Sequence, residues 1–87
     1  MAPAADPLEV KMTAFRSRYG VSEESQVGQQ AVEAALPRAA RIVRDELAAD
    51  GIDLASALAE GSIRRDSYED VVCDMVRYAI RQQADGF

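Results

Sequence analysis

The spacing of the apolar residues is the feature that most limits what this chain can fold into. Valine, leucine and isoleucine recur every three or four residues, and no segment of useful length alternates apolar and polar residues as a half-buried strand would. The longest apolar stripe consists of Val32, Leu36, Ala39 or Ala40, Val43 and Leu47. This spacing predicts an all-α protein, a small bundle of about four helices.

The first helix is expected over residues 7–19. Asp6-Pro7-Leu8-Glu9 combines an N-cap residue, a proline at the first helical position and a capping-box acid. Gly20 suits the left-handed position that ends a helix. The preceding residues 1–6 are expected to be flexible.

A long second helix is expected between Ser22 and Gly51. Ser22 is a good N-cap, and Glu23 and Glu24 place negative charge in the first turn, where the helix dipole favours it. Pro37 interrupts the helix interior, which predicts either a kink or two abutting helices. The apolar stripe continues in phase across Pro37, which favours one kinked helix.

The remaining residues predict a short third helix and a long last helix. Asp53 can cap the short helix, which ends at Gly61, and the capping box Asp66-Ser67-Tyr68-Glu69 opens a helix over about residues 67–83. A broad apolar face on this last helix comprises Tyr68, Val71, Val72, Met75, Val76, Ala79 and Ile80. Residues 1–87 are thus expected to form a single helical domain, with residues 84–87 as the start of a possible C-terminal tail.

Charge and residue types exclude several classes of function. The net charge is −5, with a pI near 4.6, so the chain as a whole repels nucleic acid and anionic membrane surfaces. Histidine, the commonest general base and metal ligand, is absent, and no stretch reaches the roughly 18 apolar residues that a membrane span requires. We therefore expect no enzyme activity, no cofactor, no bound metal and no membrane association.

The stretch EDVVCDMVRYAI, residues 69–80, could be a thiol site, a metal site or a packing element. Cys73 lies at the edge of the predicted apolar face, within a turn of Val72 and Val76, where a free cysteine usually acts as a small hydrophobic residue. A Cys-His nucleophile pair is impossible without histidine. Packing is the favoured interpretation for Cys73, and a reactive or ligating thiol is the alternative.

Two further groups of charged residues have both a functional and a simpler interpretation. Asp70 and Asp74 lie one turn apart and could bind a cation or act as an acid/base pair, but Arg77 and Arg81 nearby favour a solvated charged face. A ridge of three arginines, spaced three residues apart on the second helix, could grip phosphate or an acidic partner, or could also be a solvated face. The ridge consists of Arg38, Arg41 and Arg44.

The helix order and one motif resemble a known family. The segments AALPRAARIVRDEL, DLASALAEGSI and DSYEDVVCDMVRYAI, followed by ADGF, are similar to the small head-to-tail adaptor, or head-completion, proteins of long-tailed bacteriophages. The most distinctive stretch is VVCDMVRYAI, in the last helix. The residues that match the family's motif there are Val71, Val72, Cys73, Met75, Val76 and Ile80, and the resemblance implies that they pack.

This resemblance implies a structural virion protein that is made in the cytoplasm of the bacterial host. Such a protein forms a ring, typically of twelve copies, below the portal protein and above a neck or tail-completion protein, and DNA passes through the ring without specific binding. An acidic ring suits that role because it presents like charge to DNA. Pro37 departs from the family's unbroken helix, and relatives continue beyond the position of Phe87 with a glycine- and serine-rich tail.

A second hypothesis comes from a different class of function. The chain could be a small acidic helical regulatory module that binds a single protein partner through the arginine ridge. A connector should associate weakly alone and form rings on its portal, whereas a regulator should form a pair of defined stoichiometry. A thiol or metal enzyme is a third possibility, and it would require an exposed Cys73.

Overall fold

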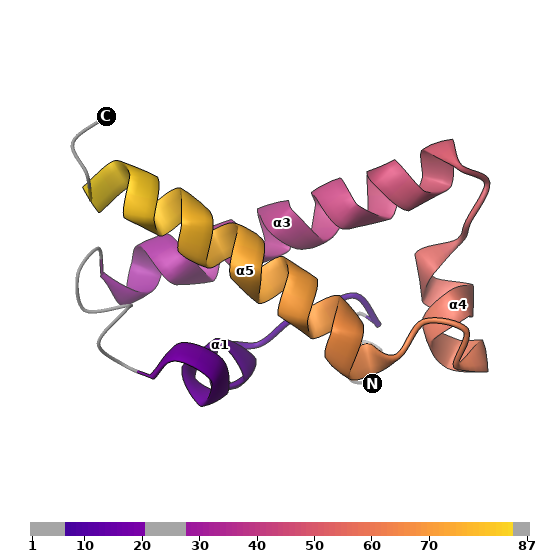
Figure 1. The fold of residues 1–87 in the computed structure, drawn as a ribbon, viewed down its shortest axis with the longest axis horizontal. Helices are drawn as coiled ribbons and strands as arrows, with labels where there is room; N and C mark the ends of the chain where they lie inside the picture. The colour runs from indigo at the N-terminus through magenta and orange to yellow at the C-terminus, as the bar shows by residue number, and fades with distance from the viewer. Residues whose placement is uncertain (1–6, 21–27, 85–87) are drawn as a thin grey trace, which may run out of the picture.

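Two long helices that cross each other form the framework of the protein. The computed structural model describes residues 7–20 and 28–84, which contain α1 (Met12–Tyr19), α3 (Gln29–Ala49), α4 (Leu54–Glu60) and α5 (Arg65–Ala84) (Figure 1). These two ranges contain no strand. The predicted all-α bundle is therefore confirmed.

The core lies mainly where α3 and α5 face each other. The apolar stripes of the two helices meet there, because residues at helical spacing share one face of each helix. The buried residues of α3 are Val32, Leu36, Ala39 and Ala40, and those of α5 are Tyr68, Val72, Cys73, Val76 and Ile80. Val43 and Leu47 continue the stripe of α3 at the edge of this core, where they are half-buried.

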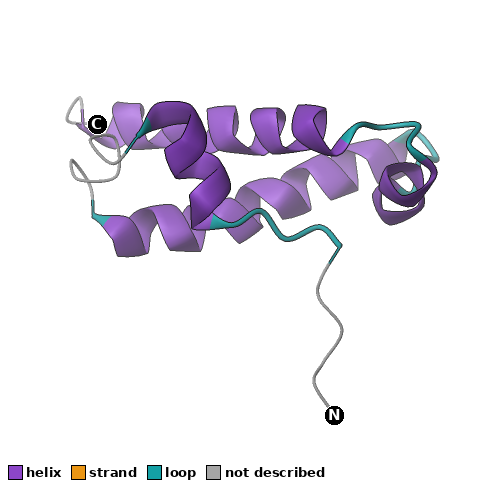
Figure 2. Cartoon of the chain, turned by 90° about the horizontal axis from the view of Figure 1, so that it is seen from below, coloured by secondary structure: helices purple, strands orange, loops and turns teal. Residues whose placement is uncertain are grey.

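The shorter helices close two sides of this framework. Helix α1 lies across both long helices and inserts Phe15, which is fully buried, and α4 lies at one end of α3 with Leu54 buried (Figure 2). The ring of Tyr19 meets that of Phe15 edge to face, with 5.1 Å between the ring centroids. The face of the α3–α5 pair opposite α1 carries no further described element (Figure 1).

The first helix begins later than predicted. Helix α1 starts at Met12 rather than residue 7, and residues 9–11 are extended. The Tyr68 hydroxyl donates a 2.6 Å hydrogen bond to the carbonyl oxygen of Leu8, and Arg65 donates to the carbonyl oxygens of Pro7 and Glu9. These carbonyls bond α5 instead of a following helical turn, so the prediction of a helix beginning at residue 7 is wrong, and the predicted cap Asp6 lies outside the described residues.

The second predicted helix is shorter at its start and continuous across Pro37. Helix α3 begins at Gln29, after Gly28 with a φ of 93°, whereas Ser22, Glu23 and Glu24 lie outside the described residues. Pro37 lies inside α3, which runs on without interruption to Ala49. This continuity bears out one helix rather than two abutting helices.

The caps of the last two helices differ in detail from the prediction. Asp53 is the N-cap of α4 as expected, but its carboxylate accepts a 2.6 Å hydrogen bond from the Ser56 hydroxyl rather than from a backbone amide. Helix α5 begins at Arg65, so Asp66 belongs to its first turn and is no N-cap. The partner expected for Glu69 is also different, because its carboxylate accepts a 3.1 Å hydrogen bond from Arg65, one turn earlier.

Candidate docking groove

The arginine ridge lies on the solvent side of α3. Arg38, Arg41 and Arg44 are all exposed, and Arg44 pairs with its neighbour Asp45 at 3.0 Å. Within the part of the chain that the structure describes, neither Arg38 nor Arg41 forms an ion pair. The ridge therefore offers two guanidinium groups for contact with another molecule.

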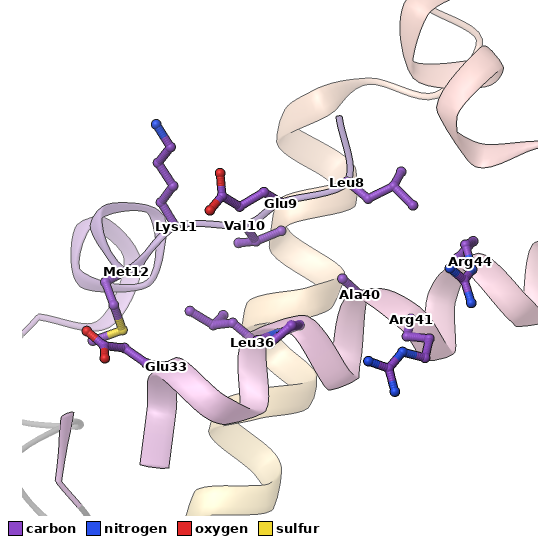
Figure 3. Close-up of a pocket in the computed structure, with 11 residues that line it drawn as sticks. Leu8, Glu9, Val10, Lys11, Met12, Glu33, Leu36, Ala40, Arg41 and Arg44 are labelled. Atoms are coloured by element: carbon purple, nitrogen blue, oxygen red, sulfur yellow. The ribbon is translucent and has the colours of Figure 1, made fainter. Parts of the chain in front are cut away.

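Arg41 and Arg44 border a groove, whereas Arg38 points to another side of the helix. The groove, with a volume of about 560 Å³, runs between residues 8–12 and one flank of α3 (Figure 3). Its apolar lining comes from Leu8, Val10 and Met12 on the N-terminal wall and from Leu36, Pro37 and Ala40 on α3. The groove thus combines an apolar floor with basic side chains at its border.

The N-terminal wall of the groove is held against α5 by polar and apolar contacts. Tyr68 and Arg65 bind the carbonyl groups of residues 7–9, and Val10 is buried in the core. Arg65 also stacks over the ring of Tyr68, with its guanidinium carbon 5.5 Å from the ring centroid. The wall therefore forms only when α5 is in place.

Charges of opposite sign mark the two ends of the α3 side of the groove. Glu33 lies at the end beside Met12, and Arg41 and Arg44 lie beyond Ala40 (Figure 3). The Glu33 carboxylate accepts a 3.0 Å hydrogen bond from the Gln29 amide but forms no ion pair among the described residues. A complementary segment would bring a base to the Glu33 end and an acid to the Arg41 end.

Cys73 is a core residue. Its side chain has no exposed surface, and burial raises the pKa of the Cys73 thiol to about 11, although the positive charge of Arg18 opposes this rise. A thiol with such a pKa is almost entirely protonated near neutral pH and is a poor nucleophile or ligand. The geometry supports the packing interpretation of EDVVCDMVRYAI.

Most residues of the last-helix motif pack beside Cys73, with one exception. Val72, Val76 and Ile80 are buried and Met75 is half-buried, but Val71 is 49% exposed. Val71 is therefore left half-exposed by this domain, unlike the other residues of the motif. Tyr78, seven residues later on the same flank, is 65% exposed.

Asp70 and Asp74 of the last helix bind side chains of α1. Arg18 donates a 2.6 Å hydrogen bond to Asp70, which raises the pKa of Arg18, and the Tyr19 hydroxyl donates to Asp74. Burial, assisted by that hydrogen bond, raises the pKa of Tyr19 to about 12. Arg77 stacks over the ring of Tyr19, with its guanidinium carbon 4.7 Å from the ring centroid.

The expected solvated face of α5 is therefore partly an interhelical contact that sequence reasoning missed. Arg18 and Asp70 are 52 residues apart, and neither carries a local signal for the other. Among residues 7–20 and 28–84, no three acidic or cysteine side chains converge as metal ligands would. No helix in those ranges is both long enough and apolar enough to cross a membrane.

The comparisons with known proteins identify no relative. No protein family, no curated protein and no solved structure matches the chain.

Proposed function

We propose that the protein is a subunit of the head-to-tail connector of a long-tailed bacteriophage. In this proposal it is a virion protein, made in the cytoplasm of the bacterial host, that forms a ring of about twelve copies between the portal protein and a downstream neck protein. DNA passes through the ring without specific binding. The observation that carries the proposal is the motif VVCDMVRYAI in the last of the expected helices, where the family's packing residues are expected.

Two surface properties support this proposal. Large apolar side chains stay exposed on both long helices, with Ile42 of α3 at 51% and Tyr78 of α5 at 65%. A domain of this size buries a limited fraction of its apolar surface alone, and contacts with neighbouring subunits would cover such residues. The net charge of −5 disfavours adhesion to the DNA that a connector must let through.

The proposal is tested by binding to the portal protein whose gene neighbours that of this chain. Wild-type protein and the triple variant R38E/R41E/R44E are mixed with purified portal and sedimented at low and at high salt. Wild type should co-sediment, and its binding should weaken as salt rises through physiological strength, where the screening length is about 8 Å. The triple variant should stay helical but bind less, because like charges meeting across an interface repel.

The control is R64E, which reverses one exposed arginine just before α5, outside the ridge. Equal binding of wild type, control and triple variant at both salt concentrations would exclude the ridge as the docking surface. The absence of portal binding by wild type would contradict the connector function itself.

A regulatory module that binds one acidic partner is the second candidate. The groove supports it, because an apolar floor bordered by Arg41 and Arg44 also suits a single acidic peptide. Stoichiometry separates the two functions. A connector yields a ring of many copies on its partner, whereas a regulator yields a complex with one copy of each chain.

A further inference from the structure

Two rows of exposed side chains on α3 have opposite orders of charge. The first row, Glu33, Pro37 and Arg41, borders the groove, and the second row, Arg38, Ile42 and Glu46, lies on a different flank of the helix. Within each row the residues are four apart, so each row forms one ridge along the helix. Read along the chain, the first row is acid, apolar, base, and the second row is base, apolar, acid.

Three of the four charges in these rows lack a partner at helical spacing. Glu33, Arg38 and Glu46 have no residue of opposite charge three or four positions away, which is the spacing that allows pairing on a helix. All four charged members of the rows are exposed, and none forms an ion pair among the described residues. The central residue of the second row, Ile42, is 51% exposed although it is a large aliphatic side chain.

We propose that the second row of one copy docks against the groove-side row of the next copy, with the two α3 helices parallel. An offset of five residues, about 7.5 Å along the helix axis, then places Arg38 of one copy opposite Glu33 of the other and Glu46 opposite Arg41. The same offset places Ile42 opposite Pro37, against the apolar lining of the groove. The contact therefore has one apolar centre and an ion pair at each end.

The order of the charges disfavours two of the alternatives, and the ring-forming function disfavours a third. Antiparallel helices in the same contact would place Glu33 opposite Glu46 and Arg41 opposite Arg38, which is repulsive. A parallel pairing of either row with itself would also bring like charges together. An antiparallel pairing of a row with itself would match its charges, but it closes a two-fold dimer that cannot extend to a ring, and the double variant R41E/E46R would weaken it instead of restoring it. Since the two rows lie about 140° apart around α3, each copy presents both halves of the contact and can bind a neighbour on each side. Such a head-to-tail contact builds a ring or a filament rather than a closed dimer.

This inference rests on the proposed ring-forming function and names the surface through which copies meet. It also assigns the ridge more narrowly, because Arg38 then contacts one neighbouring copy and Arg41 contacts the other. The exposed residues on α5, Val71 and Tyr78, take no part in this contact.

Charge exchange tests the contact in the isolated chain. Wild type, R41E, E46R and the double variant R41E/E46R are compared by sedimentation equilibrium up to millimolar concentration. Each single variant should associate at least tenfold more weakly than wild type, because its contact pairs like charges. The double variant restores opposite charges in every contact, and a 1:1 mixture of R41E with E46R restores them wherever the two chains alternate. Both should recover association to within about threefold of wild type.

Matched controls separate this effect from a change in net charge. R64E carries the same change as R41E, and E60R the same as E46R, at exposed positions outside both rows. Both controls should associate like wild type, and circular dichroism should show equal helix content in every variant. Association that follows net charge alone, or a wild type that stays monomeric at millimolar concentration, would overturn the proposal.

Cross-linking tests the register of the two helices. Chains with Pro37→Cys mixed with chains with Ile42→Cys should form disulfide-linked dimers under mild oxidation. Chains with Pro37→Cys mixed with Ala49→Cys should not, because Ala49 lies on the flank of Ile42 but two turns further along. Equal cross-linking of both mixtures would refute the register. If wild type self-associates but does not bind the portal, the connector function is contradicted and the contact between copies is not.

Discussion

A buried aspartate at position 72 tests the packing of α5, and an exposed aspartate at position 71 is its natural control. Val72 has no exposed surface, whereas its neighbour Val71 is 49% exposed. Both substitutions replace valine by aspartate in the interior of the same helix, so their effects on helix propensity and net charge are matched. The difference between them therefore reports burial.

The expected loss for Val72→Asp follows from two contributions. Removing a fully buried valine forfeits about 1.5–3 kcal/mol of apolar transfer free energy. Holding a carboxylate in the core costs about 4–7 kcal/mol at neutral pH, the equivalent of a pKa raised by about 3–5 units. The sum, about 6–10 kcal/mol, is comparable with the whole stability of a domain of this length, which is about 4–13 kcal/mol.

The assay is urea unfolding followed by circular dichroism. Val72→Asp should be largely unfolded without urea at pH 7, whereas Val71→Asp should stay within about 0.5 kcal/mol of wild type. Equal stability of the two variants would show that the buried face of α5 has been assigned to the wrong residues.

The pH dependence of the same variant provides a second measurement. Burial raises the pKa of the introduced carboxyl in the folded state above its unfolded value near 3.9. Between these two pKa values the folded protein binds more protons than the unfolded chain, so the free energy of unfolding falls as pH rises. The deficit of Val72→Asp relative to wild type should therefore shrink on acidification toward pH 4 and be complete above the raised pKa.

Three further substitutions test single contacts. Cys73→Ala should lower the free energy of unfolding by about 1 kcal/mol and leave assembly intact. Wild-type Cys73 is buried and has a pKa of about 11, so it should react with a thiol reagent only after urea is added. Rapid labelling of the native protein would contradict this. Tyr68→Phe removes the hydrogen bond to the Leu8 carbonyl and should lower the free energy of unfolding by about 1 kcal/mol. The amide NMR signals of residues 8–11 should shift, because the groove wall loosens there. Unchanged signals would show that this bond does not hold the wall. Tyr19 has a pKa of about 12 in the folded protein and near 10 in the unfolded chain, so the free energy of unfolding should fall as pH rises above 10. Tyr19→Phe should flatten that decline. An equal decline in the variant would show that another group causes it.

The helical framework could be predicted because its signals are local. The stripe from Val32 to Leu47 recurs at the period of a helix, and a face that is apolar at that period must be buried against something. The same reasoning placed Cys73 on a packing face, since its neighbours on the helix are apolar and no histidine is present to activate it. The spacing and exposure of the three arginines were also visible in the sequence, but only the groove separates Arg41 and Arg44, which border it, from Arg38.

The start of α1, the groove and the exposure of Val71 were decided by tertiary structure. Residues 6–9 have a favourable capping pattern, but Tyr68 and Arg65 bind the carbonyls that a first turn would have used, and they come from a helix nearly 60 residues away in sequence. The groove exists because these contacts hold residues 8–12 alongside α3. Val71 and Val72 are both apolar, and only the position of α3 relative to α5 determines which of them is covered. Helical periodicity reports which residues share a face, whereas the docking of one helix on another determines which part of that face meets solvent.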